Sequence, residues 1–403
     1  MNILIIGNGF DLAHGLPTKY EHFLKFMYSF IEYKTAKEEG KELGWNDGED
    51  VSYYRYFINL FNRKYDDKLA GKIIEELSEL ASNNVWIKYF TAIYESRKQA
   101  GKDGWIDFES EISSVIQALD SACKTIREQL QQGNDKAKME QWQLNILSPF
   151  ISKDGVTLKM ESCFFELKAV DYRKQQFLND LNRLIRGLEI YLSDYVEKYY
   201  VENRLPDIQK LPYLDKVLSF NYTDTYERLY GKHPFLEIDY IHGKALLNNS
   251  TESNSMVLGI DEYLKGDARN EDIEFIEFKK YFQRIHKETG CLYEEWIEDI
   301  QSEKAAFEIT RIYEENGSNK KQSQQVMSHK LFIFGHSLDI TDRDILRKFI
   351  LNDNMQTTIF YKDRADYGRK IANLVRIINQ DELIKRTGGK TKTITFKEIT
   401  KGE

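Results

Sequence analysis

The opening run of the chain constrains its fold most strongly. Residues 2–6 read Asn-Ile-Leu-Ile-Ile, and Gly7-Asn8-Gly9 follows them at once. A short, almost continuously apolar run rich in β-branched residues is typical of a strand that is buried on both faces of a parallel sheet. The sequence therefore predicts that the chain begins with a core strand that ends at a glycine turn.

Strand-like runs return late in the chain, after a long helical stretch. From about residue 20 the apolar residues take helical spacing, and the pattern stays largely helical for about 180 residues. Residues 267–315 are again helical, whereas residues 248–255 predict a mobile polar loop and residues 317–325 a polar linker. The later strand-like runs lie at residues 216–220, 237–241, 256–259, 330–335, 357–362 and 392–397.

Strands at both chain ends with helical blocks between them favour one interrupted α/β domain over two domains in tandem. We expect its core to comprise residues 1–25, 211–265 and 326–403. Residues 26–210 are predicted to form a large helical insertion, and residues 266–325 a second helical insertion with a linker.

Composition disfavours several classes of protein. The 57 Lys and Arg residues against 65 Asp and Glu give a net charge of −8, so bulk electrostatics cannot hold nucleic acid. No stretch approaches the roughly 20 apolar residues of a membrane helix. The three cysteines lie far apart and form no C-x-x-C pair, which removes a disulfide framework and a cysteine-based zinc module. We therefore expect a cytoplasmic protein with no membrane partner and no metal.

The glycine turn raises the question of a phosphate-binding loop. A strand, G-x-G and a helix can direct backbone N–H groups and a helix dipole at a phosphate. The dehydrogenase fingerprint needs a third glycine where this chain has Leu12, and no second strand ending in an acid follows about 20 residues on. A dehydrogenase is therefore disfavoured. The turn could be purely structural, but if it holds a nucleotide, Gly9 should face an open crevice.

Four segments resemble, in order, the landmarks of the sirtuin-like NAD-binding fold. The glycine turn leads into Gly15-Leu16-Pro17, which is similar to a Gly-Ile-Pro loop of that fold. Residues 220–223 (Phe-Asn-Tyr-Thr) resemble its strand-end Asn motif, and residues 241–243 (Ile-His-Gly) its His-Gly motif. Residues 335–338 (Gly-His-Ser-Leu) resemble its Gly-Thr-Ser-Leu motif. The resemblance implies an α/β fold with a sirtuin-like, Rossmann-type parallel sheet that carries large helical insertions.

A second resemblance spans both ends of the chain. Residues 2–20, 105–109 (Trp-Ile-Asp-Phe-Glu), 219–225 and 334–339 are similar to segments of the AbiH family of bacteriophage abortive-infection proteins. The helical blocks between these segments are not diagnostic. Membership would imply a role in phage defence rather than a particular reaction.

The sirtuin-like resemblance and side-chain chemistry together suggest a site. His242 follows a predicted strand and could act as general base, because an imidazole with a pKa near 6.5 can take a proton from water or a ribose hydroxyl. The Asn221 amide offers a donor and an acceptor that could hold the attacking water or a ribose oxygen. Splitting the N-glycosidic bond of NAD requires mainly orientation and electrostatics, without a metal. The ligand-contacting residues are expected to be Gly7, Asn8, Gly9, Phe10, Asp11, Tyr222, Thr223, Gly335, His336, Ser337 and Asp339.

Several of these residues have structural alternatives. His242 could be a hydrogen-bonded turn histidine and Asn221 a turn former. Asp11 could bind ribose hydroxyls or cap the first helix, and its charge would repel a neighbouring pyrophosphate. Asp339 and Asp342 are both good residues for a helix start.

Two acidic segments are further candidates for the site. Asp107 and Glu109 lie on an expected amphipathic helix, where a solvated acidic face is the plainer interpretation than a carboxylate in the site. Glu277-Phe278-Lys279 superficially resembles a nuclease E-x-K motif, but its neighbours have helical spacing, whereas that nuclease core needs a strand. His14 is expected to be a packing or surface residue.

We therefore expect a phage-defence effector that binds and hydrolyses NAD or a related nucleotide, as an NAD glycohydrolase-type enzyme. The alternatives are a non-catalytic nucleotide-sensing or partner-binding module and, less favoured, a nuclease. Protein deacylation is disfavoured because the four-cysteine zinc module of sirtuins is missing. Expected partners are a nucleotide ligand and a phage-derived trigger or partner protein, with a homo-oligomer left open.

Overall fold

A computed structural model divides the chain into two compact units, which we call the sheet unit and the helical unit. The sheet unit comprises Met1–Pro17, Tyr199–Lys244 and Glu288–Glu403, and the helical unit comprises Thr18–Lys198 and Ala245–Lys287. The structure describes residues 1–41, 51–99, 106–133, 139–150, 167–199, 201, 203–231, 233–316, 329–390 and 392–400.

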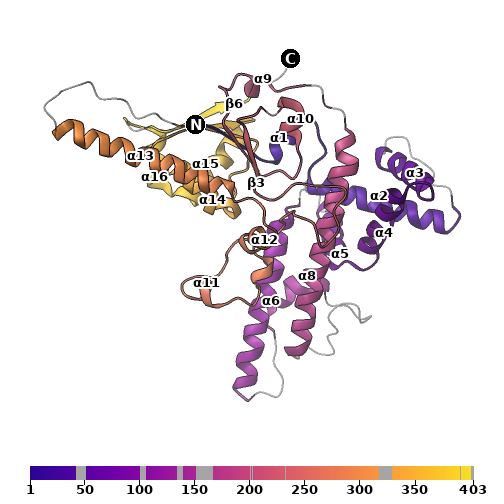
Figure 1. Cartoon of the computed structure of the whole chain (residues 1–403). Coiled ribbons are helices and arrows are strands. Elements are labelled where there is room, and N and C mark those ends of the chain that lie inside the picture. The colour runs from indigo at the N-terminus through magenta and orange to yellow at the C-terminus, as the bar shows by residue number, and fades with distance from the viewer. Residues whose placement is uncertain are drawn as a thin grey trace. The chain divides into compact units, whose positions relative to one another are not determined.

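The sheet unit contains a six-stranded sheet in which all neighbouring strands are parallel (Figure 1). The spatial order is β3-β2-β1-β4-β5-β6, so the direction of winding reverses between β1 and β4. The expected α/β class with a parallel sheet is confirmed. The strands are β1 (Asn2–Ile6), β2 (Lys216–Ser219), β3 (Glu237–Tyr240), β4 (His329–Phe334), β5 (Met355–Tyr361) and β6 (Ile394–Glu398).

Both faces of this sheet are buried, which explains the continuous apolar run of β1. Successive side chains of a strand point to opposite faces. Ile3 and Ile5 accordingly join one hydrophobic core, and Leu4 and Ile6 join another. In the ladder, Leu4 pairs with Val217 of β2 and with Phe332 of β4, all three in the second core.

Helices cover each face of the sheet. On the Ile3 face pack α13 (Leu292–Asn316), α14 (Arg343–Ile350), α15 (Arg364–Ile378) and α16 (Gln380–Thr387), which lie together in Figure 1. On the Leu4 face pack the short helices α1 (Asn8–Ala13), α9 (Pro206–Gln209) and α10 (Thr225–Tyr230). The fully buried ring of Phe10 attaches α1 to the sheet next to Phe334.

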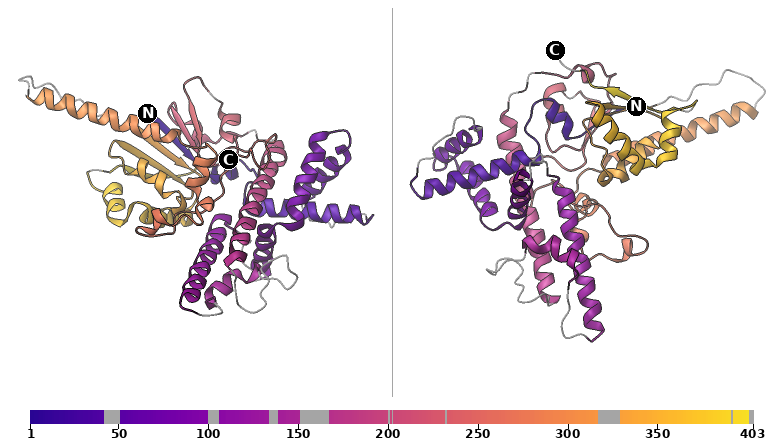
Figure 2. Two further views of the ribbon diagram at one scale, coloured as in Figure 1. Left: turned by 60° about the horizontal axis from the view of Figure 1, so that its bottom comes forward. Right: turned by 180° about the vertical axis from the view of Figure 1, so that it is seen from behind.

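The helical unit has an aromatic core. The rings of Phe90 and Phe108 stack with their centroids 3.9 Å apart, and Tyr20 stacks on Phe108 at 4.2 Å. Figure 2 shows α6 and α8 running side by side. The helices of this unit are α2 (Tyr20–Glu38), α3 (Ser52–Arg63), α4 (Lys68–Asn83), α5 (Val85–Gln99), α6 (Phe108–Gln131), α7 (Gln141–Leu147), α8 (Leu167–Ile190), α11 (Ala268–Glu271) and α12 (Lys280–His286).

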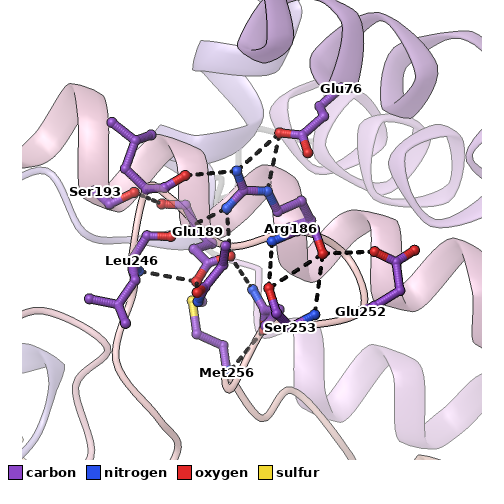
Figure 3. A network of polar contacts seen from close by, with 12 residues as sticks. Glu76, Arg186, Glu189, Ser193, Leu246, Glu252, Ser253 and Met256 are labelled. Carbon is purple, nitrogen blue, oxygen red and sulfur yellow. Dashed lines mark hydrogen bonds and ion pairs between the residues drawn. The ribbon is translucent and has the colours of Figure 1, made fainter. Parts of the chain in front are cut away.

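A buried ion pair on α8 holds the polar loop predicted at residues 248–255 (Figure 3). Arg186 Nη1 lies 2.7 Å from Glu189 Oε2, and Arg186 Nη2 lies 3.0 Å from Glu76 Oε2. The second Glu189 oxygen accepts the Leu246 N–H at 3.0 Å and the Asn249 side-chain amide at 2.7 Å. The loop is therefore fixed to the helix by hydrogen bonds to one buried carboxylate.

The observed organisation of the chain differs from the expected one in three places. Residues 256–259 form no strand, because this apolar run is buried in the helical unit, where the Leu258 N–H donates to the Gln283 side chain at 3.1 Å. The expected core range 211–265 is divided after residue 244 between the two units. The helix α13, expected in an insertion, belongs to the sheet unit because Trp296 and Ile300 are buried in its core. Within the described parts of the chain, no helix is long and apolar enough to cross a membrane.

Candidate functional site

Polar side chains follow four adjacent strands of the sheet. Asp11 comes after β1, Asn221 and Thr223 after β2, His242 after β3 and His336 after β4. Carboxyl ends of parallel strands share one edge of a sheet, and ligands of open parallel sheets bind at that edge where the winding reverses. This carboxyl edge therefore carries the candidate site.

The carboxyl group of Asp11 is buried and only partly hydrogen-bonded. Thr223 Oγ1 donates to Asp11 Oδ2 at 2.5 Å, and Thr225 Oγ1 donates to Thr223 Oγ1 at 3.1 Å. Asp11 Oδ1 has no hydrogen-bond partner among the described residues. Burial raises the pKa of Asp11 to about 6, against the opposing effect of the threonine hydroxyls. The capping interpretation is wrong, because the N-cap of α1 is Gly7 and Asp11 lies within the helix.

The side chain of Asn221 is buried beside the Asp11 carboxyl. The residue is 4% exposed, and neither Oδ1 nor Nδ2 meets a hydrogen-bond partner in the described part of the chain. Its amide lies near enough to Asp11 to oppose the increase in the pKa of that carboxyl. Buried side-chain amides are normally hydrogen-bonded, and an unsatisfied one calls for a water or a ligand. Asn221 is therefore a candidate site residue.

Asp342 lies between His242 and His336, the two histidines expected in the site. Its Oδ1 is 3.4 Å from His242 Nε2, and its Oδ2 is 3.4 Å from His336 Nε2. The Leu338 N–H donates to His336 Nδ1 at 2.9 Å, so the proton of neutral His336 is on Nε2 and directed at Asp342. The backbone of Leu338 has φ +58°, a conformation that is rare for a leucine. The ring of Phe220 meets both imidazoles edge to face, with centroid distances of 5.4 Å and 4.3 Å.

The glycine turn packs against the turn after β4. The Gly9 N–H donates to Gly335 O at 2.8 Å, the Gly7 N–H to Phe334 O at 3.2 Å, and the Phe10 N–H to Gly7 O at 2.8 Å. A Cβ atom on Gly9 would lie 2.7 Å from Gly335 O. The expectation that Gly9 faces an open crevice is therefore wrong. Gly335, with φ +69°, allows a close backbone approach, but the approaching backbone is that of Gly9 and Phe10.

Other residues nominated from the sequence have structural roles. Phe10 is fully buried among aromatic rings of the second core, which leaves its side chain no surface for a ligand. Asp339 Oδ1 accepts the Thr341 N–H at 3.0 Å and caps the 3-10 turn Ile340–Asp342, as its structural alternative predicted. His14 Nδ1 donates to Phe10 O at 2.7 Å, and its Nε2 accepts from the Tyr230 hydroxyl at 3.0 Å. These bonds confirm His14 as a packing residue.

Three further residues that were expected in the site are exposed or half-buried. Asn8 and Ser337 are exposed, and the Ser337 carbonyl accepts the Asn373 side-chain amide at 3.0 Å. The half-buried ring of Tyr222 lies 6.4 Å from the His242 ring. The sequence predicted no site role for Thr225 or Asp342. The local signal for Thr225 is its position two residues after Thr223.

Acidic residues of the helical unit are accounted for by local partners. Asp107 caps α6 by accepting the Glu109 N–H at 3.1 Å, whereas Trp105 of the same motif lies outside the described residues. Glu109 pairs with Lys280 at 2.7 Å. Lys279 of the nuclease-like E-x-K pairs with Glu262 at 2.9 Å and does not lie on a strand of the sheet. Among the residues that the structure describes, no three His, Cys, Asp or Glu side chains form a group that could hold a metal ion.

The molecule is thus an α/β protein whose parallel sheet carries a buried carboxyl, a buried side-chain amide and a His–Asp–His cluster at its carboxyl edge. Residues 3–363 match the family described as bacteriophage abortive infection AbiH. Because the match covers nearly the whole chain, the chain belongs to the AbiH family, as the resemblance predicted. No curated protein and no solved structure matches the chain.

Proposed function

We propose that this protein is an abortive-infection effector that binds NAD or a related nucleotide at the carboxyl edge and hydrolyses its N-glycosidic bond. Membership of the AbiH family implies the abortive-infection role. The observation that carries the proposal is the buried amide of Asn221, whose two polar atoms lack partners among the described residues. A nucleotide supplies the hydroxyl and amide groups that such a side chain needs.

The strand order also supports the nucleotide proposal. The order β3-β2-β1-β4-β5-β6 is that of doubly wound sheets that bind dinucleotides at the reversal point. It is compatible with the sirtuin-like, Rossmann-type core proposed from the sequence. The N–H groups of Gly7, Gly9 and Phe10 already donate to backbone carbonyls, so they are unsuited to holding a pyrophosphate. We therefore propose that the sugar of the nucleotide, rather than its phosphates, contacts this part of the edge.

His242 is the proposed general base. A carboxylate beside one imidazole nitrogen holds the proton on that nitrogen and stabilises the charged ring, and Asp342 lies in this position at 3.4 Å. His242 Nδ1 would then accept a proton from water as the water oxygen bonds to the anomeric carbon. The C–N bond breaks at the same time, its electron pair goes to the ring nitrogen of the nicotinamide, and nicotinamide leaves neutral. Asn221 would orient the sugar or the water.

A substrate comparison tests this proposal. Purified protein is incubated separately with NAD, ATP, DNA and RNA, and substrate loss is followed by chromatography. We expect loss of NAD with release of nicotinamide, which His242→Ala should abolish. His233→Ala is the control, because His233 Nε2 donates to Leu214 O at 3.0 Å near the amino ends of the strands.

Three other outcomes would contradict the proposal. Binding of NAD without turnover would favour the non-catalytic sensing module, and cut nucleic acid would favour a nuclease. Undiminished nicotinamide release by His242→Ala would remove the assigned base.

A further inference from the structure

We infer that Asp11 and Asn221 together bind an uncharged group that presents two hydrogen-bond donors and one acceptor, and that this pair rejects phosphate. The inference rests on the proposed function for the class of ligand, a nucleotide, and specifies which part of it lies between β1 and β2. It assigns the ligand contact to side chains, not to the glycine turn.

The inventory of unsatisfied atoms defines the required ligand group. Asp11 Oδ1, Asn221 Oδ1 and Asn221 Nδ2 are buried and lack hydrogen-bond partners among the described residues. The first two atoms accept hydrogen bonds, and the third donates. Asp11 Oδ2 is already engaged by the Thr223 hydroxyl at 2.5 Å, so the second carboxyl oxygen is the one left for a ligand. A complementary group must therefore donate twice and accept once.

A phosphate has the wrong chemistry for this pair. Its oxygens accept hydrogen bonds, so it could satisfy Asn221 Nδ2 but would face two acceptor oxygens. Its charge would also lie against the buried carboxyl of Asp11, where low dielectric strengthens repulsion. Backbone donors of the glycine turn do not compensate, because the Gly9 and Phe10 N–H groups already donate to Gly335 O and Gly7 O.

Two parts of a nucleotide have the right chemistry. The vicinal hydroxyls of a ribose can donate to Asp11 Oδ1 and Asn221 Oδ1 while one of them accepts from Asn221 Nδ2. A primary carboxamide can make the same three hydrogen bonds with its NH₂ and C=O groups. Both are neutral donor–acceptor groups, and they can be distinguished experimentally by removing one hydroxyl.

The test is equilibrium binding of four probes by titration calorimetry: adenosine, 2′-deoxyadenosine, nicotinamide and inorganic phosphate. Each is titrated into the wild-type protein, Asn221→Leu and the control Asn2→Leu. Asn2 is an asparagine at the start of β1, the opposite end of the strand, where its amide donates to Tyr213 O at 2.7 Å. Melting curves of each variant establish that it is folded.

We expect at least about tenfold loss of affinity in Asn221→Leu, with Asn2→Leu unchanged, because a site with buried polar groups discriminates strongly against a lost partner. At least about tenfold preference for adenosine over 2′-deoxyadenosine identifies the sugar hydroxyls as the source. Binding of nicotinamide, with the two nucleosides equal, identifies the carboxamide.

Phosphate binding that survives in Asn221→Leu would overturn the inference. So would failure of adenosine and nicotinamide alike to bind, since a bound water then suffices for the three atoms. Nicotinamide release from NAD is measured in parallel, so the two proposals can fail separately. Probe binding without NAD turnover would refute hydrolysis alone, whereas turnover that is unchanged in Asn221→Leu would refute the inferred contact and the orienting role of Asn221 but not hydrolysis itself.

Discussion

Replacing Asn221 with leucine tests whether its buried amide lacks a partner within the protein. Leucine has the same number and branching of side-chain heavy atoms as asparagine, so the change removes the polar atoms and keeps the branching of the side chain. Neither polar atom has a partner among the described residues, and the residue is 4% exposed. A buried polar group without a partner costs about 1–3 kcal/mol. We therefore expect Asn221→Leu to raise the free energy of unfolding of the ligand-free protein by as much as about 1–3 kcal/mol.

Asn254 offers a matched control, because it is the same residue type with the same 4% exposure. Its Nδ2 donates to the buried carboxylate of Glu189, and its Oδ1 accepts the Met256 N–H at 2.8 Å. A hydrogen bond to a charged group contributes about 1.5–3 kcal/mol, and its loss leaves a buried oxygen with one partner fewer. Asn254→Leu should therefore lower the free energy of unfolding by about 2–4 kcal/mol.

The assay is urea denaturation of the two variants and the wild type without nucleotide, followed by circular dichroism. We expect the free energy of unfolding to rise in Asn221→Leu and to fall in Asn254→Leu. If Asn221→Leu destabilises the protein as much as Asn254→Leu does, the Asn221 amide has partners, and the reasoning behind the site is refuted.

Burial raises the pKa of Asp11 to about 6, so the folded protein holds this proton more tightly than the unfolded chain, and stability should fall as pH rises from about 4 through about 6. Asp11→Asn should remove this pH dependence, and above about pH 7 its free energy of unfolding should exceed that of the wild type by up to about 3 kcal/mol. Urea titrations at about pH 4 and above about pH 7 measure the difference, and the same pH dependence in both proteins would contradict the prediction. Gly9→Val should cost about 1–3 kcal/mol of unfolding free energy and so lower the melting temperature, because the added side chain meets Gly335. Gly368→Ala is the control and should leave the melting temperature unchanged, because no atom lies within 4 Å of its Cβ. Equal melting curves for the two variants would show that the two turns do not pack together. Asp342→Asn should reduce nicotinamide release at least about tenfold, with an unchanged circular dichroism spectrum, because the carboxylate orients His242. Full turnover in that variant would exclude the orienting role.

Much of the sheet could be predicted from the sequence because its strands are buried on both faces. The run at residues 2–6 and the later runs at 216–220 and 330–335 lie within one residue of β1, β2 and β4. Residues 256–259 show the limit of this reasoning. A short apolar run is equally compatible with burial among helices, and periodicity cannot distinguish the two environments.

The division into units was harder to predict than the strands. Helical spacing shows that residues 292–316 form a helix, but it does not show which core the helix completes. That assignment depends on Trp296, which is buried against the sheet, a contact made far along the chain from β1 and β2. The prediction therefore placed α13 in an insertion, although it covers one face of the sheet.

The positions of the candidate site residues could be predicted from the sequence, but their contacts could not. Asn221, His242 and His336 were predicted at the carboxyl edge because each follows a strand. Asp342 was considered only for a helix start, since its position between the two imidazoles depends on the turn at Leu338 with positive φ. The tight packing of Gly9 on Gly335 joins residues more than 300 positions apart, so no local pattern could predict it.

Titration calorimetry with NAD, comparing the wild type with Asn221→Leu, tests the central claim most directly. We predict saturable binding to the wild type and at least about tenfold weaker binding to the variant, because the ligand loses the amide that it would satisfy. Equal affinity in the two proteins, or no heat of binding to the wild type, would contradict a nucleotide site at the carboxyl edge of this sheet.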